Sequence, residues 1–269
     1  CPLHERGPTH VRLLARLTTM QKETEEKQGS QVTDSVEWNG LRIEFEKREQ
    51  VIRKTKEKVA EYNLHISQFK ACRKYVKQIE RELKPGECLI YRDFVNQYND
   101  CGEKVTNLVL VRVWREATRP EILSVIKVSH ICTQKEFRSA DNYFVADVFN
   151  HHFRLGEKGL FHGFHKIFLS GDHGPHFASN QTVHHESAFY KHWNIELHLI
   201  FLCSYHAYNR CDGAGVEPKR LLQASYKASG RDRNESEITK LLNDSNYTNH
   251  KAIPFEEICR NIEQDPVFI

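Results

Sequence analysis

The sequence lacks any apolar stretch approaching the roughly 20 residues of a membrane span, which argues against a membrane protein. It contains no Cys-x-x-Cys pair, and its eight cysteines are widely scattered. A chain of 269 residues can bury a core without disulfide bonds, so the cysteines are predicted to be mostly reduced, as in the nucleus or cytosol. No secretory signal is visible. Because the chain begins at Cys1 rather than Met, it looks like a fragment or processed product, and that absence proves nothing.

A strong excess of one charge is also missing. The net charge is +3, from 39 Lys and Arg against 36 Asp and Glu, which is weak evidence for a nucleic-acid partner when taken alone. Basic residues cluster at 47–58, 70–84 and 219–233, although a solvated helix face is the simpler explanation for any one cluster. With 39% hydrophobic and 28% charged residues, the composition indicates a globular protein with a solvated helical portion.

Residues 1–84 are predicted to be a helical N-terminal region. A helix is expected around Val11–Gln21, and the polar stretch Lys22–Asn39 is interpreted as a loop or linker. From Leu41 to Leu83 apolar residues recur at steps of three, four or seven, which is the pattern of one buried helical stripe. The pair Pro85-Gly86 ends that helix.

The period then changes to that of strands. Three strands are predicted in an antiparallel meander, at Cys88–Phe94, Val105–Trp114 and Ile122–Ile131. Further elements alternate between helix and strand: a helix at Ser139–His152 capped by Ser139, a strand at His165–Ser170, a helix at Asn180–Trp193, an apolar and therefore central fifth strand at Ile195–Cys203, and a helix within Gly213–Ser229 with Pro218 in its first turn.

This order predicts an α/β fold of the ribonuclease H-like class. Three meandering strands followed by strands reached through helices would form a mixed five-stranded sheet with helices on both faces. The core is expected to span 85–231. The tail, 232–269, is charged and loop-rich, with a short helix after Pro254.

Two carboxylates stand directly after or within apolar strands. Asp93 is a charge in an otherwise apolar strand, and Asp172 lies in a glycine-rich bend after the fourth strand. Carboxylates on rigid strand ends hold the paired Mg²⁺ ions of phosphoryl-transfer sites. The simpler alternatives are that Asp93 faces solvent or pairs with Arg92 or a lysine, and that Asp172 is an ordinary turn residue.

Three segments carry a family resemblance. Leu89–Asn99 (LIYRDFVNQYN) resembles the first-aspartate strand of eukaryotic DDE/DDD transposases, and Phe168–Phe177 (FLSGDHGPHF) resembles their second-aspartate motif. Leu202–Gly215 (LCSYHAYNRCDGAG) resembles the block after the fifth strand, and its Cys203-x-x-His206 is similar to a signature of Mutator-like and related superfamilies. The resemblance covers about 85–230.

The resemblance implies roles for individual residues. Asp93 and Asp172 would be the first two ligands of Mg²⁺ or Mn²⁺. The third ligand is expected at Asp212, and Glu217 is the second choice for it. Glu235 and Glu237 are further candidates in the tail. His206 would orient a carboxylate or contact the scissile phosphate. A hydrogen-bonded structural histidine is the alternative for His206.

A zinc site is a less favoured possibility. Its ligands would come from Cys203, His206 and Cys211, with His173 and His176, although the Cys-x2-His-x4-Cys spacing is loose for structural zinc.

DNA is the predicted partner. Lys219, Arg220, Lys227 and Arg231 would contact phosphates at the mouth of the site. Aromatic residues near the acids could stack on bases, but core packing explains most of them better. The implied activity is Mg²⁺-dependent strand cleavage or transfer in the nucleus. One alternative is a catalytically silent, domesticated module that binds DNA or a protein partner, which includes a second copy of the chain in a homo-oligomer. The other is a nuclease of the same fold.

Overall fold

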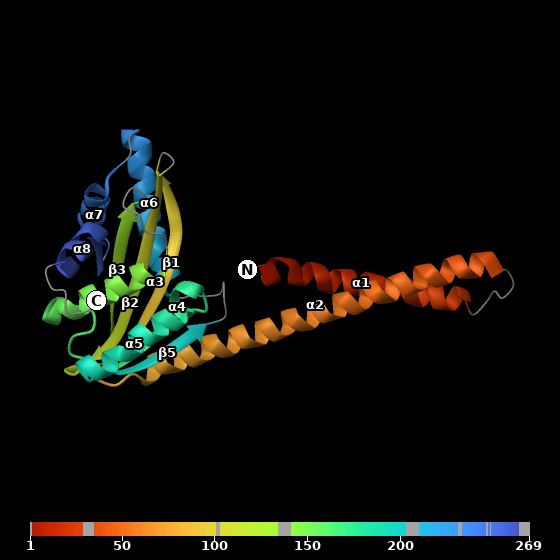
Figure 1. Cartoon of the computed structure of the whole chain (residues 1–269), viewed down its shortest axis with the longest axis horizontal. Coiled ribbons are helices and arrows are strands. Elements are labelled where there is room, and N and C mark those ends of the chain that lie inside the picture. The colour runs from red at the N-terminus through yellow and green to blue at the C-terminus, as the bar shows by residue number, and fades with distance from the viewer. Residues whose placement is uncertain are drawn as a thin grey trace. The chain divides into compact units, whose positions relative to one another are not determined.

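The computed structural model shown in Figure 1 describes residues 2–28, 35–100, 103–133, 141–202, 210–230, 233–245, 247 and 249–263, some of them by their backbone alone. The chain divides into two compact units, Cys1–Ala71 and Cys72–Ile269. No helix in the described part of the chain is long and apolar enough to cross a membrane.

The first unit is helical. Helix α1 spans Pro2–Gln28, and helix α2 spans Ser35–Glu82 and continues into the second unit. The sequence predicted the long second helix but made the first too short. The predicted linker is wrong over much of its length, because α1 continues through Gln28 and α2 begins at Ser35. Polar composition misled here, since a helix with many exposed positions needs few apolar residues.

The second unit is built on a six-stranded mixed sheet, so the α/β class is confirmed. Strands β1 (Glu87–Asp100), β2 (Glu103–Glu116) and β3 (Arg119–Thr133) form the predicted antiparallel meander. Strand β4 (Lys166–Asp172) runs parallel to β1, and β5 (Glu196–Leu202) runs parallel to β4. Strand β6 (His250–Pro254) runs parallel to β3, which gives the order β5-β4-β1-β2-β3-β6.

Two predictions about the sheet are wrong. Strand β5 lies at an edge of the six-stranded order instead of its centre. Its apolar run arises because both of its faces pack on neighbours, with Leu197, Leu199 and Phe201 on one cluster and Ile200 on the other. An apolar run shows that both faces of a strand are buried. It does not show whether another strand pairs with each of its two edges. The sixth strand, β6, was missed because five residues, two of them polar and adjacent, carry little periodic signal.

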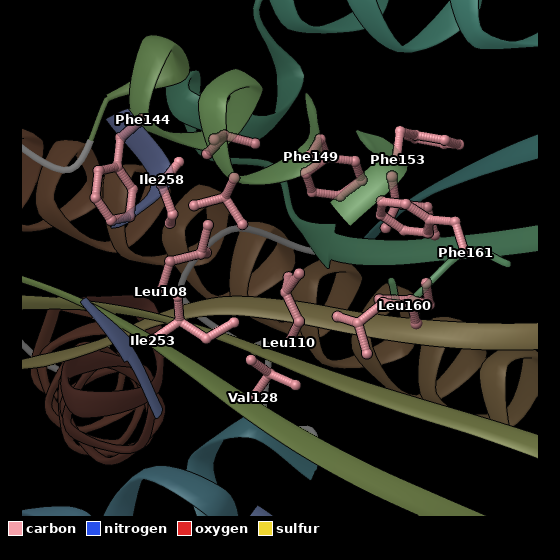
Figure 2. Packing of buried hydrophobic residues seen from close by; sticks show 14 of the residues in the cluster. Leu108, Leu110, Val128, Phe144, Phe149, Phe153, Leu160, Phe161, Ile253 and Ile258 are labelled. Carbon is pink, nitrogen blue, oxygen red and sulfur yellow. The ribbon is translucent and has the colours of Figure 1, made fainter. Parts of the chain in front are cut away.

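Helices cover both faces of the sheet. On one face, α3 (Asn142–Arg154) and α8 (Phe255–Glu263) pack against the strands. Figure 2 shows Phe144, Phe149 and Phe153 of α3 above Leu108 and Leu110 of β2. The short helix α4 (Pro175–Ala178) and helix α5 (Asn180–Trp193) contact α3 on this side, and the turn η2 (Gly156–Lys158) follows α3.

The opposite face is covered by the end of α2, by α6 (Arg210–Ser229) and by α7 (Glu235–Asn243). Val76, Ile79 and Leu83 of α2 share a buried cluster with Cys211 and Ala214 of α6.

Local signals at two helices differ from the predictions. The N-cap of α3 is Asp141, whose carboxylate accepts the Phe144 amide at 2.9 Å. The predicted cap, Ser139, lies outside the described residues. Helix α6 begins at Arg210, so Pro218 lies inside it and not in its first turn.

Candidate active site: three carboxylates on one face of the sheet

Asp93 and Asp172 occupy matching positions on two adjacent parallel strands. Leu89 of β1 lies opposite Phe168 of β4, and Tyr91 lies opposite Ser170. Two residues further along each strand are Asp93 and Asp172. Because side chains alternate along a strand, both carboxylates lie on the face that carries Leu89 and Tyr91, which is the face covered by α2 and α6.

The third acid reaches this face from α6. Cys211 and Ala214 are buried against the strands, which places the first turn of α6, with Asp212, over β1 and β2. The helix approaches β1 very closely at Gly215. A Cβ atom on that glycine would lie 2.3 Å from Cγ1 of Val95, so only a residue without a side chain fits there.

The three acids share one electrostatic field. The pKa of Asp93 is raised from 3.8 to about 8, first by burial and then by the charges of Asp172 and Asp212. At neutral pH and with no cation nearby, the Asp93 carboxyl is therefore largely protonated. The electrostatics of these three side chains therefore strongly favour a cation placed among them.

Asp172 remains ionised through its own contacts. Burial favours its neutral form, but the imidazole of His176 lies 3.5 Å away (Nε2 to Oδ1) and the Gly174 amide donates to Oδ1 at 2.9 Å. These contacts, with the charges of His176 and Arg92, outweigh burial and lower the pKa of Asp172. Asp172 is thus anchored by the bend in which the sequence placed it.

Aromatic residues beside the acids are packing residues. Phe177 is fully buried and stacks on Phe94, with ring centroids 5.6 Å apart. The His176 ring meets Phe94 edge-on at 4.9 Å, which fixes the imidazole next to Asp172. Arg92, the predicted alternative partner of Asp93, instead pairs with Glu186 on the opposite face of the sheet.

The structure distinguishes among the other candidates for the third acid, Glu217, Glu235 and Glu237. Glu217 lies five residues after Asp212 on α6, about 140° around the helix axis, so the two do not share a helix face. Its side chain is outside the described part. Glu235 accepts backbone amides from Thr133 and Glu256, and Glu237 completes the capping box of α7. These last two are therefore structural residues.

Several predicted residues cannot be placed. His206, Cys203 and Arg231 lie outside the described residues. The remaining predicted zinc ligand of this block, Cys211, is buried, and its thiol donates to the Val109 carbonyl at 3.4 Å. Burial raises its pKa well above the ordinary value, which disfavours the thiolate that zinc needs. The described cysteines, 72, 88, 132, 211 and 259, are not disulfide-bonded.

The chemistry of the donors suits a hard divalent cation. Three carboxylates on two strands and a helix end supply the oxygen ligands that Mg²⁺ and Mn²⁺ prefer. Among the described side chains, however, no group of three or more His, Cys, Asp or Glu is placed so that it could hold a metal ion. Asp172 and Asp212 are close enough to Asp93 to raise its pKa, but the three acids do not form a finished coordination shell among the described side chains.

The described basic residues of the prediction lie along α6. Lys219 is partly exposed, whereas Arg220 and Lys227 are exposed. Lys219 follows Asp212 by seven residues, two helical turns, and therefore shares its helix face. This places Lys219 on the helix face of Asp212, about 10 Å further along the axis, and the other two cations beyond it on the same helix.

Comparison of the chain with family models, with curated proteins and with solved structures finds no match.

Proposed function

We propose that this chain is the catalytic core of a DNA-binding transposase or integrase, with a ribonuclease H-like fold. It would cleave or transfer phosphodiester bonds with Mg²⁺ or Mn²⁺ held by Asp93, Asp172 and Asp212. The observation that carries the proposal is the placement of Asp93 and Asp172 at matching positions of β1 and β4, with the first turn of α6, which carries Asp212, over the same face of the sheet.

The topology supports the fold assignment. An antiparallel meander β1-β2-β3, followed by β4 and β5 added in parallel on the far side of β1, gives the order expected of a ribonuclease H-like core. In this order the end of β4, with Asp172, lies opposite the middle of β1, with Asp93. Strand β6 extends the sheet at the edge furthest from them.

The acids have complementary properties for phosphoryl transfer. Asp172 is ionised at neutral pH, while Asp93 becomes ionised only when a positive charge joins the cluster. Bound divalent cations would activate the attacking water or 3′-hydroxyl and stabilise the leaving oxygen. The carboxylates hold the charge in place, and Lys219, Arg220 and Lys227 would contact DNA phosphates along α6.

A metal-dependent nicking assay tests the proposal. Asp172→Asn keeps the shape of the bend but removes one ionised carboxylate, so we expect nicking with Mg²⁺ or Mn²⁺ to fall to background. Asp244→Asn, an exposed aspartate at the end of α7, is the matched control and should retain wild-type activity. Equal activity in the wild type and Asp172→Asn would disprove the assignment.

A second candidate is a catalytically silent module that binds DNA or a protein partner. The raised pKa of Asp93 favours it, because a cluster with one neutral acid can persist at neutral pH without metal. Titration with Mn²⁺, followed by electron paramagnetic resonance, separates the two. Binding that is lost in Asp93→Asn supports the enzyme, and wild-type protein that binds DNA but no Mn²⁺ supports the module.

A nuclease of the same fold would differ in its nucleophile. Supplying DNA with a free 3′-hydroxyl end tests this, because joining of that end to a target indicates strand transfer, whereas cleavage alone indicates hydrolysis.

A further inference from the structure

We infer that Glu80, at the end of α2, is a positioning residue that fixes Asp212 relative to Asp93. This inference rests on the proposed function, in which these two acids bind metal together. Glu80 lies on neither the strands nor the helix that carries the acids, and nothing in its sequence surroundings marks it as part of a site.

The contacts of Glu80 join three elements. Its Oε2 accepts the hydroxyl of Tyr91 at 2.6 Å and the Nε of Arg210 at 3.2 Å. Its Oε1 accepts Nη2 of the same guanidinium. Both carboxylate oxygens therefore accept hydrogen bonds. Arg210 donates two of its own N–H groups to this one carboxylate, which is the geometry that fixes a guanidinium most firmly. We call Glu80, Tyr91 and Arg210 the Glu80 network.

Each partner of Glu80 is two residues from an acid. Tyr91 precedes Asp93 on β1 and points to the same face of the sheet. Arg210 precedes Asp212 and is the first residue of α6. Glu80 thus ties the start of α6 to the strand that carries Asp93, at the level of the acid cluster.

The network is built to stay in place. Ile79, beside Glu80, is buried in the same cluster as Tyr91 and Cys211, so the backbone at Glu80 is fixed by packing. Tyr91 is buried, and the Glu80 side chain is only 17% exposed. Burial favours the neutral form of Glu80, but its hydrogen bonds to Arg210 and Tyr91 outweigh it and lower its pKa, so the network is ionic at neutral pH.

The role differs from that of a metal ligand. Glu80 uses its carboxylate on Tyr91 and Arg210, and acts on the cluster only through the backbone of α6. Loss of a group that is hydrogen-bonded directly to a metal ligand typically weakens metal affinity by about 10- to 100-fold. Glu80 acts one contact further away, through Arg210 and Tyr91, so its loss belongs at the low end of that range. We therefore expect substitution of Glu80 to lower the affinity for Mn²⁺, because Asp212 is then less precisely placed.

Glu80→Gln tests the network directly, because it keeps the shape but removes the charge that holds Arg210. Hydrogen exchange of the amides of residues 214–216, in the first bonded turn of α6, should become faster, and Mn²⁺ affinity should fall about tenfold. Glu82→Gln, an exposed glutamate on the same helix that accepts from Gln78, is the matched control and should change neither. Arg210→Met should reproduce the Glu80→Gln result.

A double-mutant cycle with Asp212→Asn separates positioning from general loosening. If Glu80 acts through Asp212, adding Glu80→Gln to Asp212→Asn causes no further loss of Mn²⁺ affinity. A full additional tenfold loss would overturn the inference, as would unchanged exchange at 214–216 in Glu80→Gln. Wild-type protein that binds no Mn²⁺ would overturn the proposed function, while the exchange measurement would still decide whether Glu80 holds α6.

Discussion

The guanidinium of Arg92 and the carboxylate of Glu186 form an ion pair in which neither side chain is more than 1% exposed. Arg92 lies on β1, directly before Asp93 but on the opposite face of the sheet, and Glu186 comes from α5. The guanidinium also lies over the ring of Phe177 at 4.7 Å. This pair fixes α5 on the strand that carries Asp93.

Breaking the pair from one side should be strongly destabilising. Glu186→Gln leaves a buried guanidinium without its counter-charge. We expect the free energy of unfolding, measured by urea denaturation, to fall by about 3–5 kcal/mol. The double variant Arg92→Met with Glu186→Leu removes both charges and should recover most of that loss. A double variant as unstable as the single one would show that packing, and not the unpaired charge, causes the effect.

The raised pKa of Asp93 makes stability depend on pH with a definite sign. Between about pH 4 and 8 the folded state holds a proton that the unfolded state releases, so the contribution of Asp93 falls as pH rises. Asp93→Asn lacks this proton. Without divalent cations, its stability relative to wild type should therefore increase by up to about 1.4 kcal/mol per pH unit across that window.

Urea unfolding at several pH values measures the difference, and Asp244→Asn should track wild type throughout. Adding Mg²⁺ at pH 8 should stabilise wild type and leave Asp93→Asn unchanged. A difference between Asp93→Asn and wild type that is constant with pH would contradict the raised pKa.

The buried pair His130 and His152 predicts a stability that falls as pH is lowered, which is opposite to the pH dependence expected from Asp93. Nδ1 of His130 lies 2.8 Å from the Leu108 carbonyl and must donate to it, so Nε2 of His130 accepts from Nε2 of His152, also at 2.8 Å. These hydrogen bonds fit a neutral His130, and burial keeps both rings neutral. Burial lowers the pKa of His130 to about 3 and that of His152 well below its ordinary value, with further lowering by His151 and Lys251. Arg112 adds to the effect on His152.

Acid should therefore unfold the protein partly by protonating these histidines in the unfolded chain. Stability is present above about pH 6.5 and is lost as pH falls towards the folded pKa values. His152→Phe removes one such proton, so the slope of stability between pH 6 and 4 should fall by about 1.4 kcal/mol per pH unit. Exposed His184→Gln is the control, and an unchanged slope in His152→Phe would contradict the neutral pair.

The sequence could predict elements and single positions, but not register or long-range contacts. Apolar period and turn residues placed the first five strands, and Asp172 lies at the end of β4 as expected. Asp93 was expected at the end of the first strand but lies in the middle of β1, which continues to Asp100. That the two acids lie on one face depends on the pairing of Tyr91 with Ser170, which no local pattern encodes.

The residues that sequence reasoning missed share a cause. Glu80 and Glu186 are charges on helices, where a solvated face is the usual explanation, yet the arginine that pairs with each is more than 90 residues away. The pair His130 and His152 gives no local signal because the two residues are 22 positions apart and lie on different elements. A buried charge or imidazole is recognisable only once its surroundings are folded.

The close approach of α6 to β1 offers a test of helix placement that leaves every acid intact. Gly215→Ala would bring a Cβ to within 2.3–2.9 Å of the Val95 side chain, so α6 must shift or Val95 must move. Overpacking of this kind typically lowers stability by about 1–3 kcal/mol. Because Asp212 lies one turn earlier on the same helix, the shift should also weaken Mn²⁺ binding.

Gly213→Ala is the matched control, two residues earlier in the same helix. Nothing lies within 4 Å of a Cβ at Gly213, so this change only replaces a poor helix former and should stabilise the protein by about 1 kcal/mol. Adding Val95→Ala to Gly215→Ala makes room for the new methyl group and should restore Mn²⁺ affinity. Opposite signs for the two glycines in urea unfolding would establish that contact with β1 sets the position of α6. If both alanines stabilise equally, α6 is not held against Val95, and the placement of Asp212 comes from the Glu80 network and the packing of Cys211 and Ala214.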